Sequence, residues 1–307
     1  MRINDSLLTA SEKAMFALRA LFEAGGYRRF AMSRFEEYDL YARYKDFLLS
    51  DRIITFTDLD GRLMALKPDV TLSVLTRTPL LPGEVRRVYY NENVYRAAPG
   101  DRGFREIMQA GVECIGDLDY PGVCETVALA GRAMAALGGD WRLCVSHLGL
   151  VTALFRASGA PERAYPELLR FVREKNAHGL AAFAAQLGLG KGADCLRCLT
   201  EIGGPLAAAL ASLKIACPTE AEAALEELEA LSEALAAAKL TGKTRLDFSV
   251  VSSMDYYDGL VFQGFLAGLP ERVLSGGQYS GLAQKLGRSG GAVGFAVYLD
   301  ALEGVLV

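Results

Sequence analysis

The chain has 307 residues, of which 51% are hydrophobic, and its 33 basic and 37 acidic residues leave a formal charge of -4. A chain of this length and composition can bury a substantial core and is typical of a soluble globular protein with one large domain and a smaller one. The slight acidity gives no bulk attraction to a polyanion such as tRNA, which argues against a nucleic-acid-binding protein.

The first predicted element is a helix that follows a polar N-terminal segment. Thr9 and Glu12 have the spacing of a capping box, apolar residues follow on one face, and Gly25 and Gly26 stop the helix. No later stretch reaches the roughly 18 to 20 uninterrupted apolar residues that a membrane span requires. We therefore expect a cytoplasmic protein with no membrane segment.

The next part of the chain has the pattern of short and long strands. Two short apolar segments, 53–56 and 62–66, flank a turn rich in Asp and Gly and predict a hairpin. Two longer alternating runs, 84–96 and 104–114, are separated by loop residues. We expect these two runs to form a pair of long antiparallel strands.

A helical region then interrupts the strands. Residues 121–137 are helical in character, 141–145 are typical of a strand, and from Gly149 to about Leu240 the chain is an Ala- and Leu-rich series of helices broken by Gly and Pro. Within this region, segment 218–222 combines a proline with the spacing of a second capping box, which predicts a helix start.

Strand character returns after the helical region, in segments 246–250, 256–265 and 293–299. Strands on both sides of a helical block predict one α+β domain interrupted by an insertion. The expected parts are a first core segment at 1–149, a helical insertion at 150–240 and a second core segment at 241–307.

Cysteine and histidine usage gives little support for a metal site. Only Cys195 and Cys198 have metal or redox spacing among the six cysteines, and neither a second pair nor a histidine cluster accompanies them. We interpret them as two thiols on a helix, with a zinc site as the disfavoured alternative. His147 and His178 are too few for a histidine-rich site, and we expect both to be structural. We predict no metal.

Four segments resemble those of a known family: 65–71, 95–113, 254–262, and 275–279 leading into 294–297. In this order and spacing they resemble the catalytic core of histidyl-tRNA synthetase and its non-synthetase relatives. The resemblance implies a class II aminoacyl-tRNA synthetase-like fold, which is an antiparallel sheet flanked by helices, usually in a homodimer. Because the sequence ends at Val307, we expect no anticodon-binding domain.

The resemblance also implies a histidine site. Zwitterionic histidine presents an ammonium group, a carboxylate and an imidazole, so acidic groups must face its donors. By similarity, Asp69 and Thr71 take the ammonium group with help from Gln109, while Glu113 and Tyr257 bracket the imidazole and Arg96 lies near the carboxylate. The implied ligand-binding residues are Asp69, Thr71, Arg96, Gln109, Glu113, Tyr256 and Tyr257.

The pattern departs from that of the synthetases where ATP would bind. Ser252 and Ala301 stand at the positions of two arginines, and Ala98 replaces the acid that would meet the adenine. Lys67 keeps the charge of a usual arginine without its bidentate geometry. A transition-state arginine contributes roughly 10³ to 10⁵ in rate where it has been measured, so we expect no amino-acid activation, no catalytic residue and no cofactor.

The family member that best fits this pattern is the regulatory subunit of short-form ATP phosphoribosyltransferase. The resemblance implies a non-catalytic protein that is required by a separate catalytic subunit and conveys feedback inhibition by L-histidine in the first step of histidine biosynthesis. It would act as a homodimer within a hetero-oligomer and without tRNA. The alternatives are a divergent histidyl-tRNA synthetase-like ligase and a histidine-sensing module with another partner.

Overall fold

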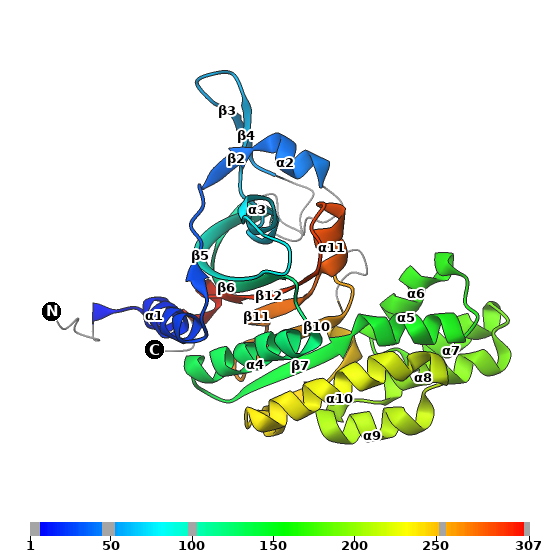
Figure 1. Cartoon of the computed structure of the whole chain (residues 1–307). Helices are drawn as coiled ribbons and strands as arrows, with labels where there is room; N and C mark the ends of the chain where they lie inside the picture. The colour runs from blue at the N-terminus through cyan, green and yellow to red at the C-terminus, as the bar shows by residue number, and fades with distance from the viewer. Residues whose placement is uncertain (1–6, 45–52, 98–102, 252–255, 304–307) are drawn as a thin grey trace. The chain divides into compact units, whose positions relative to one another are not determined.

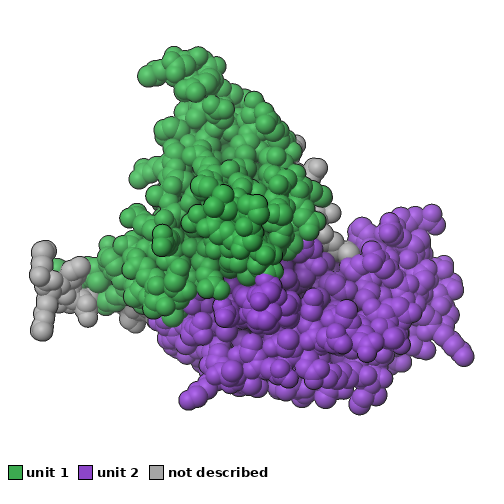
Figure 2. Space-filling view, viewed as in Figure 1, with its two compact units in different colours: residues 1–118, 268–274, 279–307 green, residues 119–267, 275–278 purple. Residues whose placement is uncertain are grey.

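The structure, a computed structural model, describes residues 7–44, 53–97, 103–251 and 256–303. The chain divides into two compact units (Figure 1; Figure 2). Unit 1 comprises residues 1–118, 268–274 and 279–307, and unit 2 comprises residues 119–267 and 275–278. Within the described ranges, no helix combines the length and the apolar character needed to cross a membrane.

Unit 1 contains part of the main sheet, a second small sheet and several helices. In chain order they are α1 (Ala10–Ala24), β1 (Arg28–Arg29), β2 (Phe35–Glu37), α2 (Tyr38–Arg43), β3 (Thr55–Thr57), β4 (Leu63–Leu66), α3 (Thr71–Arg77), β5 (Val85–Ala97), β6 (Phe104–Gly116), α11 (Ser280–Lys285) and β12 (Gly291–Tyr298). Strands β1, β5, β6 and β12 are neighbours in that order in the main sheet. β5 and β12 pair with β6 in antiparallel fashion, which confirms the predicted long pair, whereas β1 is parallel to β5.

Helix α1 covers one face of this sheet. The predicted capping box is present: Thr9 Oγ1 accepts from the Glu12 amide at 3.2 Å, and Glu12 Oε2 accepts from the Thr9 amide at 2.9 Å. Phe22 of α1 packs on Tyr89 of β5 and Phe295 of β12, with ring centroids 6.2 and 5.8 Å away. The opposite face of the sheet is therefore the one available for polar side chains.

A second, three-stranded antiparallel sheet has the order β2-β4-β3, and its β3–β4 hairpin confirms the predicted one (Figure 1). Tyr41 of α2 is fully buried in a small core with Ala65 and Leu72. On the surface of this sheet, Phe35 and Phe56 meet edge to face with centroids 5.5 Å apart, and both rings are partly exposed.

Unit 2 is dominated by helices. Its elements are α4 (Tyr120–Leu137), β7 (Trp141–His147), α5 (Leu148–Ala157), α6 (Tyr165–Arg173), α7 (Ala177–Gln186), α8 (Ala193–Glu201), β8 (Gly204–Pro205), α9 (Leu206–Ala216), α10 (Glu222–Ala237), β9 (Thr244–Leu246), β10 (Leu260–Leu266) and residues 275–278 of β11 (Leu274–Gln278). β10 pairs antiparallel with β7, β7 parallel with β9, and β9 antiparallel with β8. α4 packs on β7 and β10, and α10 runs beside α4 (Figure 1).

His147 has the structural role predicted for it, and the prediction for His178 stays a prediction. His147 ends β7, and its Nδ1 accepts from the Leu150 amide at 3.1 Å, so His147 caps the start of α5. Because Nδ1 accepts, the ring proton lies on Nε2 and is donated to Glu227 of α10 at 2.6 Å. His147 is buried, whereas His178 is exposed on α7. One imidazole thus connects a strand, the helix that follows it and a distant helix.

Two local predictions in this unit are wrong. Segment 246–250 is not one strand: β9 ends at Leu246, because Asp247 Oδ1 accepts from the amide and the hydroxyl of Ser249 and turns 248–250 into a 3-10 helix. The second capping box does not form. Residues 219–221 adopt a 3-10 turn, and α10 begins at Glu222 behind Ala221, whose side chain offers no cap.

The predicted α+β class is confirmed, with a correction to the sheets. The pairs β5–β6, β6–β12, β7–β10 and β8–β9 are antiparallel, but β1–β5 and β7–β9 are parallel, so the main sheet is mixed rather than purely antiparallel. The strand expected at 256–265 is confined to β10 and begins at Leu260. Helices α5 to α10 lie between β7 and β9 in sequence. The division of the chain at 150 and 240 stays a prediction.

Candidate functional site

The face of the main sheet opposite α1 carries the candidate site of unit 1. Side chains alternate between faces along a strand, so Gln109, Gly111 and Glu113 of β6 share this face. On β12, the register places Tyr298 opposite Gln109 and Gly294 opposite Glu113. Helix α3 packs against β6 and brings its own polar residues to the same place.

Glu113 is the central acid of this site. Its side chain is buried, with an exposed fraction of 2% for the residue, and its two carboxylate oxygens accept hydrogen bonds from Thr71 Oγ1 at 2.6 Å and from the Tyr279 hydroxyl. Burial raises the pKa of Glu113 from 4.5 to about 8, although both hydrogen bonds act in the opposite direction. The site therefore favours the uncharged acid until a cationic group or a further donor arrives.

Two glycines make room on this face. A Cβ at Gly294 would lie 1.8 Å from Glu113 Oε2, and a Cβ at Gly111 would lie 2.5 Å from the Tyr90 hydroxyl oxygen. The absence of these side chains lets Glu113 and Tyr90 lie against the sheet. Burial, together with the nearby carboxylates of Glu113 and Asp69, raises the pKa of the Tyr90 hydroxyl well above its ordinary value.

Asp69 is the second acid, at the start of α3. Its Oδ1 accepts from the Leu72 amide at 2.9 Å, and its Oδ2 lies 3.7 Å from a terminal nitrogen of Arg96. Arg96 Nε also donates to the Pro68 carbonyl at 2.8 Å, which fixes the guanidinium beside the acid. Burial raises the pKa of Asp69, and the positive charge of Arg96 opposes this shift. The site thus contains two acids and one permanent cation.

Helix α3 is anchored at both sides. Buried Glu36 accepts from Ser73 Oγ at 2.8 Å and from the Tyr41 hydroxyl at 3.4 Å, and it pairs with Arg77 at 2.9 Å. At the other end, Arg288 donates to the last carbonyl groups of the helix, with its Nε 2.9 Å from the oxygen of Leu75. These contacts hold the helix that presents Thr71 to Glu113.

Lys67 lies in the segment that leads into Asp69 and is fully buried. Its ammonium group pairs with Glu92 of β5, and its carbonyl accepts from the Tyr95 amide at 2.9 Å. The lysine therefore ties the segment before α3 to β5. The ammonium group of Lys67 is therefore engaged in an ion pair within the protein and is not a free cation for a ligand.

The structure brings five of the seven predicted site residues into unit 1. Asp69 contacts Arg96, Thr71 contacts Glu113, and Gln109 lies on the same strand face as Glu113. The remaining two belong to unit 2: the rings of Tyr256 and Tyr257 meet edge to face with centroids 4.7 Å apart, and Tyr257 lies where a Cβ at Gly277 would be.

The departures from the synthetase pattern are only partly visible. Ser252 and Ala98 lie outside the described residues. Ala301 lies in a 3-10 turn after β12, where the preceding Asp300 accepts from the Met108 amide at 2.6 Å. The methyl group of Ala301 supplies no positive charge at this position.

Two site residues were missed by the sequence analysis. Tyr279 donates to Glu113, and its place in the motif 275–279 was a signal that could have revealed it. Tyr90 had no comparable signal, because its position near Glu113 depends on the pairing of β5 with β6. Both add a hydroxyl group to a site already lined by acids.

The arrangement is suited to recognition rather than to covalent chemistry. Its acids can accept hydrogen bonds from an ammonium group and from a ring N–H, and Arg96 can donate to a carboxylate. Within the part of the chain that the structure describes, no cluster of three or more histidine, cysteine or acidic residues could hold a metal ion. A small zwitterion with an additional basic group matches these groups in number and sign.

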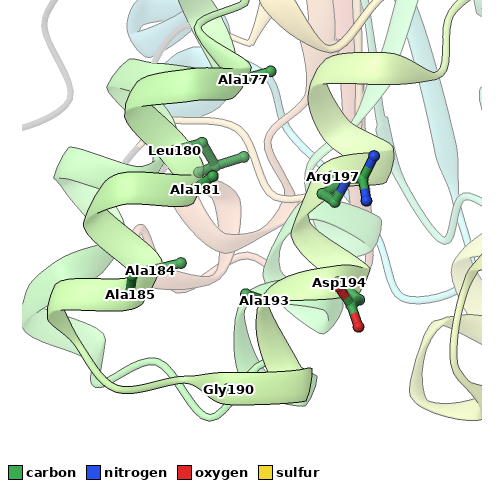
Figure 3. Close-up of a pocket in the computed structure, with 9 residues that line it drawn as sticks. All are labelled: Ala177, Leu180, Ala181, Ala184, Ala185, Gly190, Ala193, Asp194 and Arg197. Carbon is green, nitrogen blue, oxygen red and sulfur yellow. The ribbon is translucent and has the colours of Figure 1, made fainter.

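A separate groove of about 220 Å³ lies in unit 2 between α7 and α8 (Figure 3). Small apolar side chains of α7 line one side of the groove. On the other side, α8 contributes Ala193 and two charged residues, Asp194 and Arg197 (Figure 3). The lining consists of Ala177, Leu180, Ala181, Ala184, Ala185, Gly190, Ala193, Asp194 and Arg197. None of these residues belongs to the predicted histidine site.

Comparisons with known proteins agree with the resemblance seen in the motifs. Residues 4–302 match the family model of histidyl-tRNA synthetase. An ATP phosphoribosyltransferase regulatory subunit of Symbiobacterium thermophilum is 32% identical over 290 residues, which cover 92% of this chain and 72% of that protein.

Two solved structures have the same fold. An ATP phosphoribosyltransferase regulatory subunit/histidyl-tRNA synthetase of Bacillus halodurans has a TM-score of 0.84 and 27% identity, and the match covers 97% of this chain and 79% of that one. A chain of the ATP phosphoribosyl transferase HisG:HisZ complex of Thermotoga maritima has a TM-score of 0.72 over 94% of this chain and 97% of that one. At 18% identity, the second match concerns the fold alone.

Proposed function

Since this chain belongs to the family of ATP phosphoribosyltransferase regulatory subunits, within the larger histidyl-tRNA synthetase family, we propose that it enables a separate short-form catalytic subunit and conveys feedback inhibition by histidine. The reaction supported is transfer of a phosphoribosyl group from phosphoribosyl pyrophosphate to ATP, the first step of histidine biosynthesis. This chain carries out no catalytic step. It acts in the cytoplasm as a homodimer within a hetero-oligomer, without tRNA.

The observation that carries the proposal is the pair of buried acids in unit 1 with a guanidinium beside them. In the proposed complex, Asp69 and Thr71 accept and orient the ammonium group of histidine, with Gln109 close by, and Arg96 donates to the carboxylate. Glu113 accepts a hydrogen bond from an imidazole N–H. Its raised pKa supports this role, because a buried acid without a cationic partner is the group that gains most from such a donor.

Inhibition requires only a difference in affinity between two assemblies. If histidine binds the inactive arrangement of the complex more tightly by about 1 to 3 kcal/mol, it shifts the equilibrium 5- to 150-fold toward that arrangement. The catalytic subunit then loses activity without any contact between histidine and its own substrates. The role of Tyr257 beside the imidazole, and the membership of Tyr256 in the site, stay predictions from the family resemblance.

Loss of cations favours this reading over a ligase. Formation of an aminoacyl-adenylate needs positive charge around the phosphates as the charge on them shifts. Ala301 supplies none, and Ser252, which lies outside the described residues, is not a cation either. What is kept is the acid-lined site for an amino acid, and what is lost is the chemistry that would activate it.

The decisive experiment is an assay of phosphoribosyl-ATP formation by the short catalytic subunit of the same organism, with and without this chain, across a series of histidine concentrations. We expect activity that depends on the chain and falls as histidine rises. Glu113→Gln should keep the stimulation and weaken the inhibition, whereas Glu233→Gln, at an exposed position of α10, should change neither.

The alternatives predict different outcomes in the same assay. A catalytic subunit that is fully active alone, and indifferent to this chain, would overturn the regulatory role. Histidine binding without any effect on that subunit would point to a sensing module with another partner. Stimulation without inhibition would retain the partner and reject histidine as the effector.

A further inference from the structure

The two donors to Glu113 come from the starts of two different helices of unit 1. Thr71 is the first residue of α3, and its Oγ1 lies 2.6 Å from Glu113 Oε1. Tyr279 directly precedes α11, and its hydroxyl donates to the other carboxylate oxygen. The acid therefore keeps both donors only while α3 and α11 keep their places relative to each other.

Neither helix is long enough to hold its place by itself. α3 has 7 residues and α11 has 6. Isolated helices shorter than about 12 to 15 residues are marginal in water, so the positions of both depend on contacts with the rest of unit 1. For α3, these contacts include Glu36 along its side and Arg288 at its C-terminal end.

A Schellman motif at the end of α11 fixes the backbone of Arg288. Gly287 has a φ of 73° and donates to the Gln284 carbonyl at 2.9 Å. The Arg288 amide donates to the Ala283 carbonyl, also at 2.9 Å. These two bonds are the pair that defines the motif, and the left-handed conformation at its centre favours glycine. The position from which the Arg288 side chain departs is therefore set by α11.

The guanidinium of Arg288 caps the C-terminal end of α3. Its Nε donates to the Leu75 carbonyl at 2.9 Å, and a terminal nitrogen donates to the Thr76 carbonyl at 3.2 Å. The last carbonyl groups of a helix lack partners within it and carry partial negative charge, so a cation with several donors suits them. These carbonyls lie about 6 Å along the helix from Thr71, at a rise of about 1.5 Å per residue. Arg288 thus acts on the end of α3 opposite to the one that meets Glu113.

We propose that Arg288 is a positioning residue for the ligand site of unit 1, which joins α3 to α11 and so keeps Thr71 and Tyr279 on Glu113 together. The contacts form a closed ring, from Glu113 through Thr71 and α3 to Arg288, and back through α11 and Tyr279. Arg288 acts on the acid through the two helices. The identity of the ligand, histidine, rests on the proposed function, whereas the ring of contacts does not depend on it.

Arg77 offers a matched control at the same end of α3. It is the last residue of the helix, carries the same charge as Arg288 and pairs with Glu36 of β2 at 2.9 Å. It therefore ties α3 to β2 rather than to α11. Loss of Arg77 should loosen α3 alone, whereas loss of Arg288 should loosen both helices.

The first test needs no ligand. Hydrogen–deuterium exchange of the full-length chain, read by mass spectrometry, reports local opening of individual segments. We expect Arg288→Gln to speed exchange in residues 71–77 and in residues 279–285, and Arg77→Gln to speed it in residues 71–77 only. Unchanged exchange in residues 279–285 of Arg288→Gln, or an increase spread evenly over unit 1, would overturn the proposal.

The second test measures histidine affinity by titration calorimetry in a double-mutant cycle. Arg288→Gln should weaken binding by about tenfold, the effect of losing one hydrogen bond to a charged group. In a Tyr279→Phe chain, which has already lost that donor, Arg288→Gln should weaken binding much less, because residues that act through one another are not additive. Equal losses in the two chains would mean that Arg288 only stabilises the fold.

The two tests separate failure of this inference from failure of the proposed function. If the unmodified chain does not bind histidine, the proposed effector is rejected, and the exchange experiment still decides whether Arg288 couples the helices. Arg288→Lys keeps a cation and donors at the end of α3, so its exchange and affinity should lie between those of the unmodified chain and Arg288→Gln. If Arg288→Gln fails to fold, Arg288→Lys carries the same comparisons.

Discussion

Glu113 and Gly294 face each other across β6 and β12, and the carboxylate of Glu113 fills the space that a side chain at Gly294 would take. A Cβ at Gly294 would lie 1.8 Å from Glu113 Oε2 and 2.5 Å from the Val112 carbonyl oxygen. Real Cβ contacts are not this short, so either the acid or the strand must move to admit a methyl group. Glu113 can therefore take this position only because residue 294 has no side chain.

Gly294→Ala adds only a methyl group, but we expect it to lower both the stability of the chain and its affinity for histidine. We expect a loss of stability of about 1 to 3 kcal/mol, as for other overpacked cores, and a loss of histidine affinity because Glu113 is displaced. Urea unfolding and titration calorimetry measure the two effects. Gly242→Ala is the control, because a Cβ there meets nothing within 4 Å. Equal behaviour of the two variants would mean that the acid is not held by Gly294.

Glu113→Gln should weaken histidine binding. The substitution removes a charged acceptor of an imidazole N–H, and a hydrogen bond to a charged group contributes about 1.5 to 3 kcal/mol. Calorimetry with the purified chain gives the change in dissociation constant, and the exposed Glu233→Gln variant gives the baseline. An affinity that does not change would mean that histidine binds elsewhere or not at all.

The pH dependence of stability should reveal the raised pKa of Glu113. In the folded chain this pKa is about 8, against an ordinary value of 4.5, so folding takes up a proton between these values. Stability from Glu113 is therefore present below pH 4.5 and is lost as the pH rises toward 8, by about 1.4 kcal/mol for each unit of separation. Unfolding curves from pH 5 to 9 should show the unmodified chain losing stability relative to Glu113→Gln. Parallel curves would contradict the raised pKa.

His147→Ala should destabilise unit 2. It removes the cap of α5, which is worth about 0.5 to 2 kcal/mol, and leaves Glu227 without its donor. We expect a total loss of about 1 to 3 kcal/mol in chemical unfolding. His178→Ala provides the natural comparison, since it is the other histidine and is exposed on α7. If both variants unfold at the same denaturant concentration, the capping interaction contributes nothing measurable.

The chain should not activate histidine. Exchange of pyrophosphate into ATP that depends on histidine reports formation of an aminoacyl-adenylate, and we expect none above background. A histidyl-tRNA synthetase assayed in parallel shows that the conditions allow detection. Robust exchange by this chain would reverse the inference drawn from Ala301 and Ser252, and it would favour the ligase alternative.

The sequence predicted those parts of the fold that depend on local chemistry. The capping box of α1, the β3–β4 hairpin and the long strands β5 and β6 have short-range signals, and the structure confirms all three. The failure at 246–250 has a local cause as well: the side chain of Asp247 bonds to Ser249, and this bond competes with the strand that the alternating pattern favours.

The candidate site was predictable only as far as its motifs extend. Asp69, Thr71 and Glu113 were identified from segments that resemble a family, and the structure brings Thr71 to Glu113. The role of Tyr90 depends on which residue of β6 stands opposite it, namely Gly111, and register between strands cannot be read from either strand alone. The match between a glycine and a neighbouring ring is a property of the paired sheet.

Lys67 and Glu92, 25 residues apart in sequence, form an ion pair that joins the segment before α3 to β5, with Lys67 fully buried and Glu92 partly exposed. Loss of Glu92 leaves the fully buried ammonium group of Lys67 unpaired, at a cost of about 3 to 5 kcal/mol, whereas joint replacement by apolar residues of similar volume can be neutral. The two positions are therefore expected to be substituted together rather than one at a time. A substitution at one survives only with a matching change at the other, and in related chains we expect residues 67 and 92 to vary together.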